Sequence, residues 1–136
     1  MFCLDTDVLS AVIKRDPPLH LIRRLARTPP TEQCTTAITL AELLYGVARR
    51  GSDELAERVH GLIASAGAVL PFDEPAARRY GHLRAQLEHD GQRLAEPDLR
   101  IAAIALSRDA TLVTANLRHF ARVPGLRAEN WLIDDG

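Results

Sequence analysis

The first fourteen residues, MFCLDTDVLSAVIK (Met1–Lys14), indicate the fold class of the whole chain. An apolar run over Met1–Leu4 stops at Asp5, which is the pattern of a short, buried strand. Asp7 is a residue type that caps helices, so we expect a helix from there to about Lys14. A buried strand followed at once by a helix is typical of α/β proteins.

The alternation of strand and helix patterns continues to the end of the chain. Further short strands are expected at Gln33–Thr36, Ala68–Phe72 and Thr111–Thr114, with a last one leading to Trp131. The helical patterns between them cover more of the chain, at Leu19–Ala26, Leu40–Arg49, Asp53–Ala66, Glu74–His89, Leu99–Leu106 and, as a single turn, Leu117–Phe120. Short apolar strands separated by helices predict an α/β fold with a parallel sheet.

Length and composition limit the class of protein. A chain of 136 residues with 46% hydrophobic residues is long enough for one packed domain and too short for two ordinary ones. No apolar run is long enough to span a bilayer, and Asp5 and Asp7 interrupt the segment where a secretory signal would lie. Cytoplasmic residence is therefore expected, and Cys3 and Cys34 are interpreted as buried thiols rather than as a disulfide.

The charge of the chain is balanced. A formal net charge of −1 argues against a protein that coats nucleic acid by bulk electrostatics. All seventeen basic residues except Lys14 are arginines. Arginine suits phosphate binding. Codon bias in a GC-rich genome is an alternative explanation for the excess of arginine over lysine.

Four polar residues fall where a parallel sheet collects its ligands. Asp5 ends the first strand, Glu42 lies in the first turn of the predicted third helix and Asp98 in that of a later helix. Asn116 follows the strand at Thr111–Thr114. Ligands of open α/β sheets bind beyond the carboxyl ends of the strands, so we predict that these side chains converge.

Each of these residues also has a purely structural interpretation. Asp5 is able to cap the first helix, and Thr39–Glu42 matches a capping box, in which the glutamate bonds the backbone of the cap. Asp98 favours the positive end of a helix dipole, and Asn116 is a common turn residue. Only their convergence would distinguish a site from these local roles.

Three converging carboxylates would require a cation. Their charges repel one another and raise their pKa values unless a positive ion offsets them. All are hard oxygen ligands, and no histidine or cysteine lies nearby at zinc-like spacing. This set suits Mg²⁺ or Mn²⁺, and a carboxylate-held Mg²⁺ with open positions performs phosphoryl chemistry.

Four segments in order along the chain resemble the motifs of PIN-domain ribonucleases, in particular the VapC-type toxins. They are Leu4–Ser10, Thr39–Val47, Asp98–Leu106, and Thr111–Phe120 followed by Val123–Leu126. The resemblance implies one PIN domain over residues 1–136, with three α/β/α layers and a mainly parallel sheet. It also implies a pocket for Mg²⁺ or Mn²⁺, endoribonuclease activity on single-stranded RNA, a homodimer, and a partner antitoxin that covers the groove near the site.

The resemblance also assigns roles to residues. Asp5, Glu42 and Asp98 match the acidic positions of the family, whereas the fourth position, often aspartate, is Asn116 here. The hypothesis is that Asp5 and Asp98 hold the metal, while Glu42 binds it or orients the attacking water. Cleavage would leave a 5′-phosphate and a 3′-hydroxyl, and Asn116 would orient water or bind through its amide oxygen.

Two other functions stay open from the sequence. Asp5-Thr6-Asp7-Val8 also resembles the nucleophile–acid pair of haloacid-dehalogenase-like phosphatases, but their phosphate-binding lysine has no match, because Lys14 is the sole lysine and lies too near the start. The other alternative is a PIN-like interaction module without activity, which Asn116 keeps open. The sequence does not identify the RNA, the antitoxin or the number of metal ions.

Overall fold

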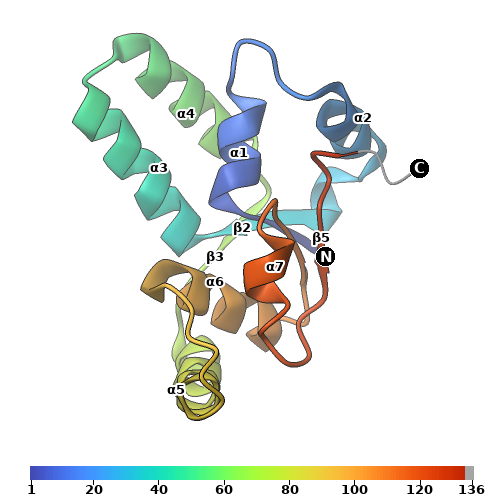
Figure 1. The fold of residues 1–136 in the computed structure, drawn as a ribbon. Coiled ribbons are helices and arrows are strands. Elements are labelled where there is room, and N and C mark those ends of the chain that lie inside the picture. Colours follow the sequence, from blue (N-terminus) through green and yellow to red (C-terminus); the bar gives the residue numbers. More distant parts are fainter. Residues whose placement is uncertain (134–136) are drawn as a thin grey trace.

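A single parallel sheet organises the chain in a computed structural model that describes residues 1–133 (Figure 1). Its strands, in the order β3-β2-β1-β4-β5, are all parallel to their neighbours. They are β1 (Phe2–Leu4), β2 (Gln33–Thr36), β3 (Ala68–Leu70), β4 (Thr111–Val113) and β5 (Ala128–Glu129). The order reverses between β1 and β4, so the sheet has a topological switch point there.

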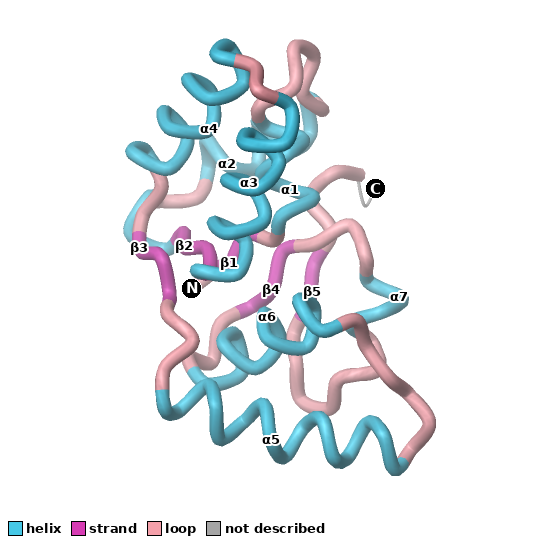
Figure 2. Tube along the Cα trace, turned by 90° about the vertical axis from the view of Figure 1, so that its left-hand side faces the viewer, coloured by secondary structure: helices cyan, strands magenta, loops and turns pink. Residues whose placement is uncertain are grey.

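Helices cover both faces of the sheet (Figure 2). One layer, α1–α4, packs against one face and the other layer, α5–α7, against the opposite face. The helices are α1 (Thr6–Val12), α2 (Leu19–Arg27), α3 (Ala37–Arg50), α4 (Asp53–Ser65), α5 (Glu74–His89), α6 (Glu96–Ser107) and α7 (Leu117–Phe120), with a 3₁₀ turn at Pro30–Glu32. The prediction of a three-layer α/β/α fold with a parallel sheet is confirmed. No helix in residues 1–133 is both long and apolar enough to cross a membrane.

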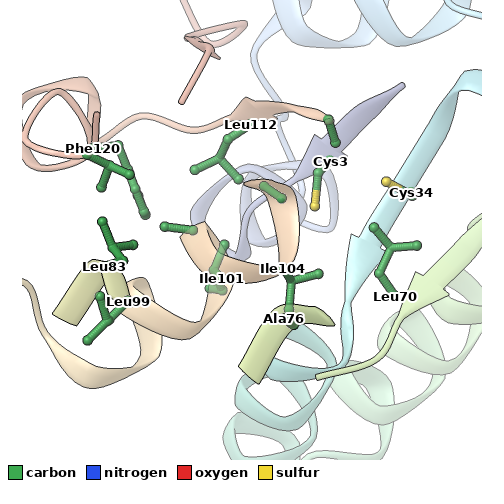
Figure 3. Close-up of a cluster of buried hydrophobic side chains, with 14 of the residues drawn as sticks. Cys3, Cys34, Leu70, Ala76, Leu83, Leu99, Ile101, Ile104, Leu112 and Phe120 are labelled. Carbon is green, nitrogen blue, oxygen red and sulfur yellow. The ribbon is translucent and has the colours of Figure 1, made fainter. Parts of the chain in front are cut away.

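Two hydrophobic cores lie on opposite faces of the sheet because side chains alternate along each strand. In β1, Cys3 belongs to the core under α5 and α6, whereas Leu4 belongs to the core under α1–α4. Figure 3 shows Cys3 and Cys34 on neighbouring strands, beside Ile104 of α6. Both cysteines are buried and free, as predicted. Ile101–Ala105 is also buried throughout, so α6 is the most enclosed helix of its layer.

Two predicted helix starts are wrong, and both errors bear on the site. Asp5, not Asp7, caps α1, because its carboxylate accepts from the backbone N–H of Thr6. In α3 the cap is Thr36, whose hydroxyl accepts from the backbone N–H of Thr39. The capping box at Thr39–Glu42 is therefore excluded, and Glu42 lies in the second turn rather than the first.

The predicted helix at Leu19–Ala26 is present as α2, but its apolar residues are buried only in part. Leu21 is its fully buried residue, whereas Leu19 is 61% and Ile22 is 36% exposed. On the same helix, Arg24 stacks over the ring of the buried Trp131, with 4.7 Å between the guanidinium carbon and the ring centroid. Leu19 and Ile22 are thus two large apolar side chains of α2 that face outward.

Candidate active site

Asp5 is held rigidly at the carboxyl end of β1. Its backbone N–H donates to the carbonyl of Val113 at 2.9 Å, which extends the pairing of β1 with β4. Its Oδ1 accepts from the N–H of Thr6 at 2.8 Å, and the residue is only 4% exposed. The two roles considered for Asp5 thus coexist, because a carboxylate that caps α1 also lies at the switch point of the sheet.

Thr114 connects the ends of β4 and β1. Its hydroxyl donates to Oδ2 of Asp5 at 2.8 Å and accepts from the backbone N–H of Asn116 at 3.0 Å. The side chain is fully buried. Sequence reasoning missed this threonine, although its place at the end of a strand beside β1 would have been a signal once the strand order was known.

Asp7 has a different role from the one expected from the sequence. Its Oδ2 accepts from the backbone N–H of Ala115 at 3.0 Å, so the side chain turns toward the loop after β4 instead of capping α1. Its Oδ1 is buried and has no hydrogen-bond partner within residues 1–133. A buried oxygen without a partner is costly, so a cation, a water molecule or another ligand bound there would be favourable.

The carboxylates of the site influence one another's protonation. Burial, followed by the charge of Asp7, raises the pKa of Asp5 from 3.8 to about 6, against hydrogen bonds from Thr114 and Thr6 that lower it. Burial also raises the pKa of Asp7. The charge of Asp98 raises the pKa of Asp5 by a smaller amount, so the three aspartates share one electrostatic environment.

Glu42 reaches the same region from α3. Its Oε1 accepts a hydrogen bond of 2.7 Å from the hydroxyl of Thr6, which lies 3.1 Å from the hydroxyl of Thr39. These threonines connect α1 to α3 and fix the direction of an otherwise exposed carboxylate. Sequence reasoning did not assign a role to Thr6, because its contacts lie more than thirty residues away along the chain.

Asp98 lies in the first turn of α6 and is half-buried. Burial raises its pKa, the charge of Glu42 adds to this, and the charge of His119 opposes it. Asp98 is therefore within the electrostatic influence of both Glu42 and His119. Asn116 occupies the N-cap position of α7, where its exposed side chain makes no capping bond.

The donor chemistry of the site fits a hard divalent cation. It consists of carboxylate oxygens, one of them the partnerless Oδ1 of Asp7, and their mutual repulsion would be relieved by a positive ion. In the orientations that the structure shows, no three His, Cys, Asp or Glu side chains within residues 1–133 form a group that would hold a metal ion together. Asp5, Glu42, Asp98 and Asn116 therefore stay a proposed set.

Comparison with known proteins identifies the family. The model of the PIN domain family matches residues 2–126. Ribonuclease VapC2 of Haemophilus influenzae is 36% identical over 131 residues, covering 96% of this chain and 98% of the relative. The tRNA(fMet)-specific endonuclease VapC of Salmonella typhimurium is 37% identical over 130 residues, covering 96% and 97%.

Solved structures agree with this result. The VapBC complex of Salmonella typhimurium bound to DNA contains a chain with a TM-score of 0.84 and 36% identity, covering 96% of this chain and 97% of that one. The VapBC2 complex of Rickettsia felis, bound to a DNA fragment of its promoter, gives a TM-score of 0.84 at 29% identity. From its sheet order, its motifs and these relatives, the chain belongs to the PIN domain family, in the group of VapC ribonucleases.

Proposed function

We propose that this chain is a metal-dependent endoribonuclease and the toxin of a toxin–antitoxin pair. The observation that carries the proposal is the buried acidic site at the switch point of the sheet, where Asp5 shares its electrostatic environment with Asp7 and Asp98. Its relatives include proteins named as ribonucleases and an endonuclease specific for tRNA(fMet). Because the chain belongs to the PIN family, the phosphatase alternative is no longer favoured.

VapC nucleases of the PIN family generally depend on a divalent metal ion. We propose Mg²⁺ or Mn²⁺ for this chain, held by Asp5 and Asp98 with Glu42 and Asp7 nearby. When bound, such an ion lowers the pKa of water and offsets the negative charge that develops on a scissile phosphate.

The protein itself orients the reacting groups. Thr114 holds Oδ2 of Asp5, and the N–H of Thr6 holds its Oδ1, so this carboxylate has one direction. The hydroxyl of Thr6 also positions Glu42 to receive a proton from the attacking water. As the water oxygen bonds to phosphorus, the bond from phosphorus to the 3′-oxygen breaks and that oxygen takes a proton from solvent, so the products are a 5′-phosphate and a 3′-hydroxyl. Asn116, exposed at the rim, is placed to contact substrate or water.

The proposed partners follow from the relatives. One solved relative, VapBC-5 of Mycobacterium tuberculosis, is described as a member of the VapBC family of toxin-antitoxin systems, so we propose an antitoxin partner for this chain. We also propose a homodimer and a cytoplasmic site of action on RNA, with residues 1–136 acting as one domain. The exposed Leu19 and Ile22 of α2 are candidates for contact with the antitoxin or the second protomer.

Cleavage of RNA by the purified protein tests the proposed function. The protein should cut total RNA or tRNA in Mg²⁺ and not in EDTA. Asp5→Asn should keep the cap of α1 and the fold but lose cleavage by a factor of at least about 100, while Asp16→Asn, an exposed aspartate outside the site, should cut normally. Cleavage by Asp5→Asn at the wild-type rate would refute the assignment, and a folded, inactive wild-type protein would favour the interaction module.

A further inference from the structure

A groove extends from the proposed active site between three helices of one layer. α3 packs against both α1 and α4 (Figure 1), and the groove between them has a volume of about 390 Å³. Thr6 and Glu42, the hydrogen-bonded pair described above, line it at one end. The groove is therefore continuous with the site and large enough for part of a polymer chain.

The opposite end of the groove is strongly basic. Lys14, Arg15, Arg50 and Arg58 all line it, in a protein whose formal net charge is only −1. Arg58 is engaged, because it donates to the carbonyl of Ile13 and pairs with Glu54. Lys14, Arg15 and Arg50 are exposed and form no ion pair with any residue in the described part of the chain.

The helix geometry connects the acidic end to the basic end. Glu42, Gly46 and Arg50 follow one another at four-residue spacing on α3 and all line the groove. At 1.5 Å per residue, Glu42 and Arg50 lie about 12 Å apart along the helix. Gly46 leaves the groove open between them, since a Cβ added there would have no heavy atom within 4 Å.

We infer that this groove binds the backbone of single-stranded RNA next to the phosphodiester that is cut. Lys14, Arg15 and Arg50 contact the phosphates of the nucleotides that flank the cleavage point. Ser10 and the apolar side chains of the floor contact the sugars and bases. The inference rests on the proposed ribonuclease function and adds to it the route that the substrate takes.

The chemistry of the lining favours RNA over a peptide. Three cations without ion-pair partners among residues 1–133 suit a ligand with a regular series of negative charges, and Glu42 is the single carboxylate in the lining. An RNA strand also has a reason to reach Glu42, because its phosphodiester is the group that the site would cut. A peptide in the same groove would need several acidic residues opposite these cations.

Salt-dependent binding tests the inference without requiring cleavage. The probe is a fluorescently labelled oligouridylate, titrated in EDTA over a range of salt concentrations and followed by anisotropy. The variant Lys14→Gln/Arg15→Gln/Arg50→Gln should bind at least about tenfold more weakly. Its plot of log affinity against log salt should lose a slope of about 2, which is three contacts at roughly 0.7 each for single strands.

The control removes three positive charges elsewhere. Arg23→Gln/Arg27→Gln/Arg79→Gln changes exposed arginines that do not line the groove, and it should leave the slope close to that of the wild type. Equal slopes for the two triple variants would overturn the inference. Unchanged RNA binding together with loss of binding to the proposed antitoxin would also overturn it, because a peptide would then be the occupant.

Failure of the inference is distinguishable from failure of the proposed function. If the wild type cuts RNA in Mg²⁺ but the groove variant keeps its salt slope, the substrate route is wrong and the nuclease stands. If the groove variant loses its slope but the wild type never cuts RNA, the groove binds RNA and the proposed catalysis is wrong.

Discussion

The buried hydroxyl of Thr114 donates a hydrogen bond of 2.8 Å to Oδ2 of Asp5, a residue 109 positions earlier in the chain. This bond joins the carboxyl ends of β4 and β1 at the point where the strand order reverses. It also lowers the pKa of Asp5, in opposition to burial and to the charge of Asp7. A single threonine therefore links the stability of the sheet to the charge state of the proposed site.

Thr114→Val should damage the site more than the fold. The change keeps the shape but leaves a buried carboxylate oxygen without its donor, which costs about 1–3 kcal/mol of unfolding free energy. Mn²⁺ affinity, measured by calorimetry, should fall together with cleavage. The control is Thr35→Val, which removes a buried hydroxyl that donates to the carbonyl of Leu4 at 2.7 Å. It should lose stability with unchanged Mn²⁺ affinity, and equal losses of affinity in both variants would contradict the linkage.

Asp7→Asn should weaken metal binding while preserving the loop after β4. The asparagine still offers an oxygen to the N–H of Ala115, but it removes the negative charge and the partnerless Oδ1. We expect the Mn²⁺ affinity to fall by about tenfold or more, a loss at least as large as that for outer-sphere partners of a metal. Asp16→Asn is the charge-matched control, and unchanged affinity in Asp7→Asn would exclude Asp7 from the site.

The metal-free protein should become less stable as the pH rises through the range from 3.8 to about 6. In this range Asp5 ionises in the unfolded chain but stays protonated in the folded protein, so the folded state binds more protons and unfolding becomes easier. The difference of about two pH units corresponds to roughly 3 kcal/mol at most. Urea unfolding in EDTA should show this decline in the wild type and a smaller one in Asp5→Asn. A wild-type stability that rises over the same range would contradict the assigned direction.

Gly67→Ala should destabilise the fold at the start of β3. A Cβ there would come within 2.3 Å of the carbonyl oxygen of Gln33, which is backbone and has little freedom to move. The expected loss is about 1–3 kcal/mol of unfolding free energy, as for other overpacked positions. Gly61→Ala, inside α4 with open space around it, should instead stabilise by roughly 0.5–1 kcal/mol. Thermal unfolding of the two variants measures the contrast.

The regular structure follows from local sequence patterns. The apolar run before Asp5, the helical periodicity of Glu74–His89 and the strand at Gln33–Thr36 were all predicted at or near their observed bounds. Hydrophobic periodicity and turn residues act over short distances, so a sequence without coordinates already contains this information. The same reasoning placed Asp5 at the end of the first strand, where the structure has it.

Side-chain partners far apart in the chain were decided only by the tertiary structure. Asp7 is a residue type that commonly caps helices. Its carboxylate instead accepts a hydrogen bond from the backbone N–H of Ala115, because the end of β4 lies beside it in the folded protein. Glu42 matches a capping box, yet it bonds Thr6 of another helix. Local propensities are worth about 1 kcal/mol each, and long-range packing and hydrogen bonds are large enough to override them. The sequence by itself therefore determined the strands, the helices and the carboxylates available, and tertiary packing decided which of those carboxylates meet.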